Sequence, residues 1–449
     1  MSIARTWWTG CTLAITVFTT IPLAAQDPVP LVEAFKPGHA YTVDVQVKVS
    51  GKLSLPAAEK GKPPQVVPIE GASRLVYDER ILDADEPGSQ KAVRSYREVE
   101  FKRVVGTNLQ DAAIRPSVRR MVVIRSNGNR APFSPDGPLT WGEIDLVRTD
   151  VFNPAAVPGL LPNGPVKPGQ SWKASDAAVA EITDMQKVDE GGLTVEFTGM
   201  TTLSGKAAAK LRLSGTVRGV NEDGPSRQKL EGTAYFLTES GLLSYLSIKG
   251  THELLDGAGQ TVGAIEGQFI MTRTELATLP ADLADASLRG LSLKPDVENT
   301  QLLHDDANLG VRFLYPRGWR VGAVQGKQVT LDHSKLGGGI LITVEAASKV
   351  PSAEDYQREV TAFLQKEKAK VNVVAVPVRV RPEPGQLDRF TLEAEFDKDS
   401  ARLEYAVLKQ TDGGATVAAR LPAATASELR TDVDRVIRSL SITKKIAEK

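Results

Sequence analysis

The fold of most of this chain is decided by the stretch Tyr41-Thr42-Val43-Asp44-Val45-Gln46-Val47-Lys48-Val49. Apolar and polar side chains alternate along it with a period of two, so that one face of the segment is apolar and the other is polar. This alternation is typical of an antiparallel strand that packs one face on a core and exposes the other to water. We therefore predict that the chain enters a β-sheet here.

Similar patterns continue to residue 274, separated by turn sequences such as Asn221-Glu222-Asp223-Gly224 and Ser126-Asn127-Gly128. A helix is predicted only near residues 139–148. So many long strands predict that residues 26–278 form one mostly β domain, built as a large curved antiparallel sheet or an open barrel. The further predicted strands cover residues 74–82, 93–105, 118–126, 179–188, 193–198, 209–220, 230–238, 242–254 and 262–274.

A short motif occurs twice in this β-rich stretch. Phe35-Lys36-Pro37-Gly38-His39-Ala40-Tyr41 and Val166-Lys167-Pro168-Gly169-Gln170-Ser171-Trp172 both read apolar-Lys-Pro-Gly-x-x-aromatic, and each opens a run of predicted strands. One interpretation is two related halves with a shared cleft. The other is that Lys-Pro-Gly is a common turn before a strand. The sequence leaves both open.

The N-terminus has the pattern of a secretory signal. Arg5 and the free amine supply positive charge, residues 11–23 are uncharged and mostly apolar, and Ala25 offers a small residue before Gln26. The apolar run is shorter than the roughly 20 residues that span a bilayer. We expect residues 1–25 to be removed, leaving a soluble protein in the periplasm or outside the cell. Cys11 lies inside this segment, so the mature chain is expected to lack a thiol.

The overall charge of the chain does not favour nucleic-acid binding. Lys and Arg total 55, Asp and Glu also total 55, and the formal net charge is zero. A nucleic-acid-binding protein normally carries an excess of basic residues on one face. We therefore expect no nucleic-acid partner, and any electrostatic partner must meet a local patch.

A second domain is predicted after a linker at residues 279–300, where prolines bracket a short Ala-rich stretch. Residues 301–449 show strands, a helix opening at Ser352 with Asp355 three residues on, four more strands and a final helix. Thr425 stands three residues before Glu428, which predicts a capping box for that final helix. Two one-sided helices on a largely antiparallel sheet predict an α+β sandwich.

Three features of this region carry a family resemblance. They are the segment Leu309-Gly310-Val311-Arg312-Phe313-Leu314-Tyr315-Pro316-Arg317-Gly318-Trp319-Arg320-Val321, the turn Gly337-Gly338-Gly339 and the closing Val436-Ile437-Arg438-Ser439-Leu440. Together they resemble a PsbP-like or DcrB-like domain over residues 305–443. The resemblance implies an α-β-α sandwich and an accessory role rather than catalysis, and it names no ligand. The N-terminal region resembles large exported β domains of uncharacterised proteins.

No motif predicts catalytic, cofactor-binding or metal-binding residues. His252-Glu253-Leu254-Leu255-Asp256 resembles His-Glu-x-x-His, but it ends in Asp and lies in a predicted strand, where its two ends cannot reach one zinc ion. His304-Asp305-Asp306 with Asn308 lacks the alternating ligands and central glycine of a calcium loop, and we interpret it as a solvated turn. The sequence contains no Gly-x-Ser-x-Gly elbow.

One local patch is a candidate binding site. Between residues 91 and 130 basic residues far outnumber acidic ones, and two predicted strands carry most of them. Arginine forks suit carboxylate and phosphate groups, so an envelope protein, an anionic glycan or a lipid headgroup is a candidate partner. The alternative is an ordinary solvated sheet face. The candidate anion-binding residues are Arg94, Lys102, Arg115, Arg119, Arg120, Arg125 and Arg130.

From these patterns we expect an exported, non-catalytic accessory or ligand-binding protein without a cofactor. The alternative is a hydrolase with a carboxylate-based site in the N-terminal cleft, because two acids suffice for such chemistry and acids are plentiful. A deep pocket with two facing acids would favour the hydrolase.

Overall fold

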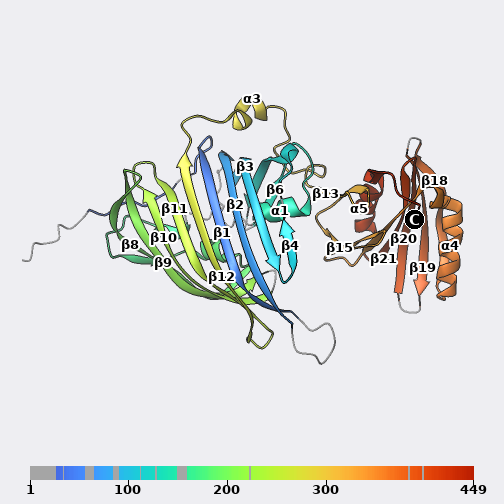
Figure 1. Cartoon of the computed structure of the whole chain (residues 1–449), viewed down its shortest axis with the longest axis horizontal. Helices are drawn as coiled ribbons and strands as arrows, with labels where there is room; N and C mark the ends of the chain where they lie inside the picture. Colours follow the sequence, from blue (N-terminus) through green and yellow to red (C-terminus); the bar gives the residue numbers. More distant parts are fainter. Residues whose placement is uncertain are drawn as a thin grey trace, which may run out of the picture.

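The computed structural model describes residues 27–33, 35–55, 65–83, 90–111, 113–126, 129–148, 159–221, 224–382, 385–396 and 399–448. The chain is mostly β, with large antiparallel sheets and a smaller α+β region, as the alternating pattern predicts. Figure 1 shows the two parts side by side, with the large curved sheet in blue to yellow and the C-terminal region in orange to red.

The N-terminal region is built on one sheet of twelve strands. Their order is β6-β5-β3-β2-β1-β12-β11-β10-β9-β8-β7, and β4 pairs with the C-terminal end of β3. The early and late strands of the region meet where β1 pairs with β12. The strands are β1 (Ala40–Leu55), β2 (Gln65–Asp83), β3 (Gln90–Val105), β4 (Asn108–Asp111), β5 (Arg120–Ser126), β6 (Asn129–Phe133), β7 (Ser171–Lys173), β8 (Lys187–Leu203), β9 (Lys206–Asn221), β10 (Gly224–Leu237), β11 (Leu242–Leu255) and β12 (Thr261–Glu275).

The two Lys-Pro-Gly motifs form the same turn. Gly38 and Gly169 both have positive φ, 89° and 85°. In each turn a backbone N–H donates back to the lysine carbonyl three residues earlier, from His39 to Lys36 at 3.0 Å and from Gln170 to Lys167 at 3.1 Å. The motif is therefore a repeated glycine turn before β1 and β7.

A row of glycines crosses the large sheet from strand to strand. Gly267 on β12 faces Gly250 on β11, and Leu230 on β10 pairs with both Gly250 and Gly215 of β9. A Cβ on Gly250 would lie 2.1 Å from the Lys229 carbonyl oxygen, and one on Gly215 would lie 2.0 Å from that of Gly192. Without side chains the neighbouring backbones approach closely, so the sheet curls along this row (Figure 1).

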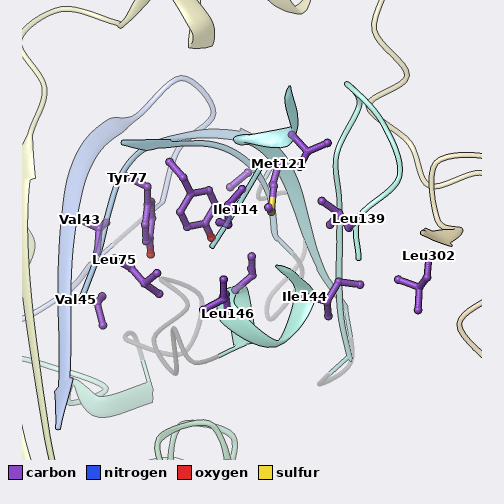
Figure 2. Close-up of a cluster of buried hydrophobic side chains, with 14 of the residues drawn as sticks. Val43, Val45, Leu75, Tyr77, Ile114, Met121, Leu139, Ile144, Leu146 and Leu302 are labelled. Carbon is purple, nitrogen blue, oxygen red and sulfur yellow. The ribbon is translucent and has the colours of Figure 1, made fainter. Parts of the chain in front are cut away.

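The concave face of the sheet is filled by two short helices and by apolar side chains. Figure 2 shows this core, in which Leu146 of α1 (Trp141–Arg148) lies toward Leu75 and Tyr77 of β2, and Ile144 of the same helix lies toward Leu139 and Leu302. The predicted helix near residues 139–148 is confirmed by α1.

The strand predicted at residues 179–188 is wrong in its first part. Residues Asp176–Thr183 form helix α2, and the following strand, β8, begins only at Lys187. The Ser175 side chain accepts a hydrogen bond from the Ala178 N–H, which caps the helix start. A short Ala-rich run has no strong alternation, so the cap decides its conformation.

Residues 279–300, predicted as a linker, pack partly on the outer face of the large sheet. Leu283, in a short 3-10 turn, and Leu288, in α3 (Asp285–Leu288), are buried against Val93 of β3. The Arg80 side chain donates to the Leu283 carbonyl at 2.8 Å. Figure 1 shows α3 above the ends of the strands.

The C-terminal region has a seven-stranded sheet, in the order β15-β16-β17-β21-β20-β19-β18, and a three-stranded sheet, β13-β14-β22. Phe390 on β19 packs under helix α4, whereas its neighbour Arg389 pairs with Asp434 of α5, so the helices cover opposite faces. The elements are β13 (Leu302–Asp306), β14 (Val311–Tyr315), β15 (Trp319–Gln325), β16 (Gln328–His333), β17 (Gly339–Glu345), α4 (Ala353–Lys366), β18 (Lys370–Arg381), β19 (Gln386–Phe396), β20 (Asp399–Gln410), β21 (Gly413–Pro422), α5 (Ala426–Ser439) and β22 (Ser441–Ile442).

The caps of these two helices differ. The Ser352 hydroxyl accepts from the Asp355 N–H at 3.0 Å, as the sequence predicts. The predicted capping box at Thr425 and Glu428 is wrong, because the Thr425 hydroxyl instead donates to the Leu336 carbonyl at 3.0 Å. No helix within the described ranges is long and apolar enough to cross a membrane.

Candidate functional site at the junction of the two regions

The two regions join through buried main chain beside α1. Leu139 forms a parallel β-bridge with Leu302, and the Leu303 N–H donates to the Leu139 carbonyl at 2.8 Å. The Arg317 guanidinium donates to the Pro132 carbonyl at 2.5 Å. Leu139 and Leu302 are both buried in a core cluster that extends into both regions, and Figure 2 shows them side by side.

A pocket of about 320 Å³ lies at this junction. One wall comes from the start of α1 and the others come from β13, β14 and β15. Small-ligand sites of this size occur preferentially between structural units, with aromatic walls and a few polar groups. The lining residues are Thr140, Trp141, Gly142, Leu303, His304, Asp305, Tyr315, Arg320 and Val321.

Arg320 is the charged group of this pocket that has no partner of its own. Its guanidinium carbon lies 4.8 Å from the centre of the Trp141 ring, in a cation–π contact. The side chain is exposed, and no ion pair of Arg320 is found among the described residues. Because the side chain is exposed, its N–H groups are accessible to an acceptor.

His304 and Tyr315 are the neutral polar groups of the pocket. Burial lowers the pKa of His304, although Asp306 and Asp305 oppose the shift. Burial raises the pKa of Tyr315 to about 12, although Arg320 opposes it. His304 is half-buried in β13 rather than in the predicted solvated turn, and it stacks on Phe313 with ring centres 4.7 Å apart. Its Nε2 is buried and has no hydrogen-bond partner in the described part of the chain.

Glu143 holds the aromatic wall in position. Its carboxylate accepts from the Thr140 N–H at 2.8 Å, and the Thr140 hydroxyl accepts from the Glu143 N–H at 3.2 Å, which forms a capping box. The same carboxylate accepts from the Arg115 side chain at 2.8 Å. These bonds orient the first turn of α1, which carries Trp141. The pattern Thr140-x-x-Glu143 is a sequence signal that could have found this helix start.

Replacing Glu143 by glutamine should flatten the pH dependence of stability. Burial raises the pKa of Glu143, but the hydrogen bonds from Arg115 and Thr140 together lower it by more than burial raises it. The pKa of Glu143 therefore lies below its usual 4.5. An acid with a lowered native pKa stabilises the fold above its unfolded pKa, and this contribution is lost as pH falls through the native pKa. Glu143→Gln should cost about 2 kcal/mol at neutral pH, with a smaller difference from wild type near pH 3.

Urea unfolding across this pH range measures the effect. Glu428→Gln is the matched control, because Glu428 is exposed in the first turn of α5 and should change stability little. A Glu143→Gln variant whose stability parallels that of wild type at every pH would contradict the role of this carboxylate.

The structure separates the described members of the predicted basic patch. Arg94 is a core residue, 2% exposed, that pairs with Glu79 and stacks 4.4 Å from the centre of the Tyr77 ring. The reason is a β-bulge, because Tyr96 pairs with Tyr77 and Glu98 with Val76, which leaves Arg97 as an extra residue. Strand faces exchange at such a bulge, so Arg94 points inward although Glu98 is exposed.

The other patch residues lie in different surroundings. Arg115 belongs to the junction through Glu143, and Arg120 pairs with Asp136 at 2.6 Å beneath α3. Arg119 is exposed, and Lys102 is exposed beside a shallow hollow on the outer face of the sheet. The side chains of Arg125 and Arg130 lie outside the described residues.

The N-terminal region also contains a buried chain of acids and arginines. Arg273 pairs with Glu33 at 2.8 Å and stacks on Tyr41, whose hydroxyl donates to Glu79 at 2.5 Å. Glu33 is 7% exposed and Glu79 is 0% exposed, so a substrate in solution cannot reach either carboxylate. Each acid is neutralised by an arginine. This arrangement is structural and does not favour the carboxylate hydrolase.

The histidine motif at residue 252 has structural contacts as well. His252 Nε2 lies 3.3 Å from Asn221 Nδ2, and Glu253 accepts from Arg227 at 2.6 Å. Among the residues with described positions, no group of three His, Cys, Asp or Glu side chains is placed to hold a metal ion.

Comparisons with known proteins return low similarity. No family model and no curated protein matches the chain. The solution structure of PsbP (CyanoP) from Synechocystis sp. PCC 6803 is 14% identical, with 32% of this chain and 92% of that chain covered and a TM-score of 0.27. DynF from the dynemicin biosynthesis pathway of Micromonospora chersina is 11% identical, with 58% and 90% covered and a TM-score of 0.15. At these scores neither likeness bears on function.

Proposed function

We propose that this protein is an exported, non-catalytic binding protein that holds a small ligand in the junction pocket. The observation that carries the proposal is the unpaired Arg320 stacked on Trp141 inside that pocket. A charged group with a fixed stacking face and a free hydrogen-bonding edge is a typical element of ligand recognition. Export is the part of the proposal that rests on the signal-like pattern of residues 1–25.

A binding role suits the chemistry of the pocket better than catalysis. Near neutral pH His304 and Tyr315 are both uncharged, since burial shifts each pKa away from 7. Asp305 lies 3.7 Å from Arg312, an arginine that offsets its charge. The sequence resemblance of residues 305–443 to PsbP-like domains implies an accessory role, which agrees with binding.

Replacing Gly142 by leucine should block the pocket without unfolding the protein. Gly142 lines the pocket from the first turn of α1, and a Cβ there would meet only the Thr140 hydroxyl, at 4.0 Å. Leucine is a better helix former than glycine, so stability should hold or rise slightly. The variant should bind the ligands of the wild-type protein at least about tenfold more weakly, because the new side chain occupies their space.

Ligand-detected NMR of the mature protein with a library of small acids, bases and neutral compounds tests this prediction. Gly257→Leu is the control, because Gly257 lies in the open turn between β11 and β12 with no atom within 4 Å of an added Cβ. Ligands that bind wild type and Gly142→Leu equally well would show that the junction pocket is not the site.

A further inference from the structure

We infer that the ligand of the junction pocket is a flat aromatic carboxylate held by Arg320, an inference that rests on the proposed function. The Arg320 guanidinium carbon lies over the Trp141 ring, 4.8 Å from its centre, and the side chain is exposed, so the ring restricts the planar fork while its N–H groups stay accessible. A guanidinium edge matches the two oxygens of a carboxylate with two parallel hydrogen bonds. Lysine, a point charge, would not impose this geometry.

The balance of charges around the pocket favours an anion. Asp305 is offset by Arg312, with Nε and Oδ2 3.7 Å apart, and Arg115 is matched by Glu143 at 2.8 Å. Asp306 lies beyond His304, where its carboxylate accepts from the Asn308 and Leu309 N–H groups at 2.8 and 2.9 Å. Arg320 faces Asp332 across the β15–β16 pair but forms no ion pair among the described residues. A ligand carboxylate would supply an ion-pair partner.

The shape and lining of the pocket favour a planar ring on this carboxylate. Trp141, Tyr315 and His304 provide three aromatic groups around a space of about 320 Å³, which holds a fused bicyclic ring but not a polymer. Aromatic rings pack well in offset or edge-on contact with other rings.

Binding of 2-naphthoate and of its neutral amide, 2-naphthamide, tests the inference on the mature protein. Titration calorimetry should show that wild type binds the carboxylate at least about tenfold more tightly than the amide, because only the carboxylate pairs with the guanidinium. Arg320→Gln should remove this preference, so that the carboxylate and the amide bind with similar affinity. Arg320→Lys should retain part of it, since the charge remains and the fork is lost.

Arg358→Gln is the control, because Arg358 is an exposed arginine on α4 that neither lines the pocket nor pairs with a residue that does. It should leave the carboxylate preference within twofold of wild type. Rising salt should weaken naphthoate binding and leave naphthamide binding unchanged.

Equal binding of the two compounds, or a preference that survives Arg320→Gln, would overturn the inference. Failure of both compounds to bind at millimolar concentration would also overturn it. A library screen that returns only neutral or cationic ligands, none of which binds Gly142→Leu, would contradict the carboxylate assignment and leave the proposed binding function supported. A screen in which every ligand binds Gly142→Leu as well as wild type would contradict both the carboxylate assignment and the proposed function.

Discussion

The free energy of unfolding should fall by about 3 kcal/mol when Gly215 is replaced by alanine. An added Cβ would lie 2.0 Å from the Gly192 carbonyl oxygen and 3.0 Å from the Leu193 Cα. Both are backbone atoms of the adjacent strand, so the clash cannot be relieved by turning a side chain. The two strands must separate, which breaks ladder hydrogen bonds at the point where the sheet curls. Urea unfolding followed by circular dichroism measures the loss.

Gly267→Ala is the matched control in the same row of glycines. A Cβ on Gly267 meets no atom nearer than 3.9 Å, so alanine fits. Because glycine in a strand interior is about 0.5–1 kcal/mol less stable than alanine, this variant should gain stability slightly. Equal changes in the free energy of unfolding in Gly215→Ala and Gly267→Ala would contradict this prediction, because they would show that the close approach of β9 to β8 does not exclude a side chain at residue 215.

The second large effect is expected at the buried pair of Glu33 and Arg273. Glu33→Ala should destabilise the protein by about 3–5 kcal/mol, because it leaves a buried cation without its carboxylate. The Arg273 side chain is 1% exposed, and its Nε and Nη2 atoms have no hydrogen-bond partner in the described structure. Unfolding in urea measures this loss, and proteolysis near residue 33 should become faster.

The double variant Glu33→Leu with Arg273→Met separates the charge from the packing. Replacing both charges by apolar side chains removes the unpaired cation, so most of the stability should return. Arg273 also stacks 4.4 Å from the centre of the Tyr41 ring, and that contact is lost in the double variant. Equal losses in the single and double variants would mean that the cost is one of packing alone.

Much of the fold could be predicted because its cause is local. Alternation in Tyr41–Val49 places Val43 and Val45 in the core, as predicted, and Ser352 caps α4 through the Asp355 N–H. The prediction failed where local signals were weak. The segment Asp176–Thr183 has few β-branched or aromatic residues, and the Ser175 cap decides in favour of a helix.

The candidate site was much harder to predict. The predicted basic patch treats residues 93–105 as one regular strand, but the extra residue Arg97 exchanges the faces of β3 and sends Arg94 into the core. The sequence gives no strong signal for a bulge here, since no glycine stands at or beside Arg97. The sequence predicts a turn at His304 because this residue follows the predicted linker and precedes a predicted strand, but pairing with Phe313 makes it part of β13.

The sequence by itself determined the β-rich character of the N-terminal region and the α+β order of the C-terminal region, because alternation and helix caps depend on residues close together in the chain. It also determined the neutral overall charge, which depends on composition alone. Only the tertiary structure decided which charges meet. Glu33 reaches Arg273, and Trp141 reaches Arg320, across long separations in the chain. No local propensity encodes such contacts. They follow from the register of the large sheet and from the β-bridge between Leu139 and Leu302, which places two distant segments against each other.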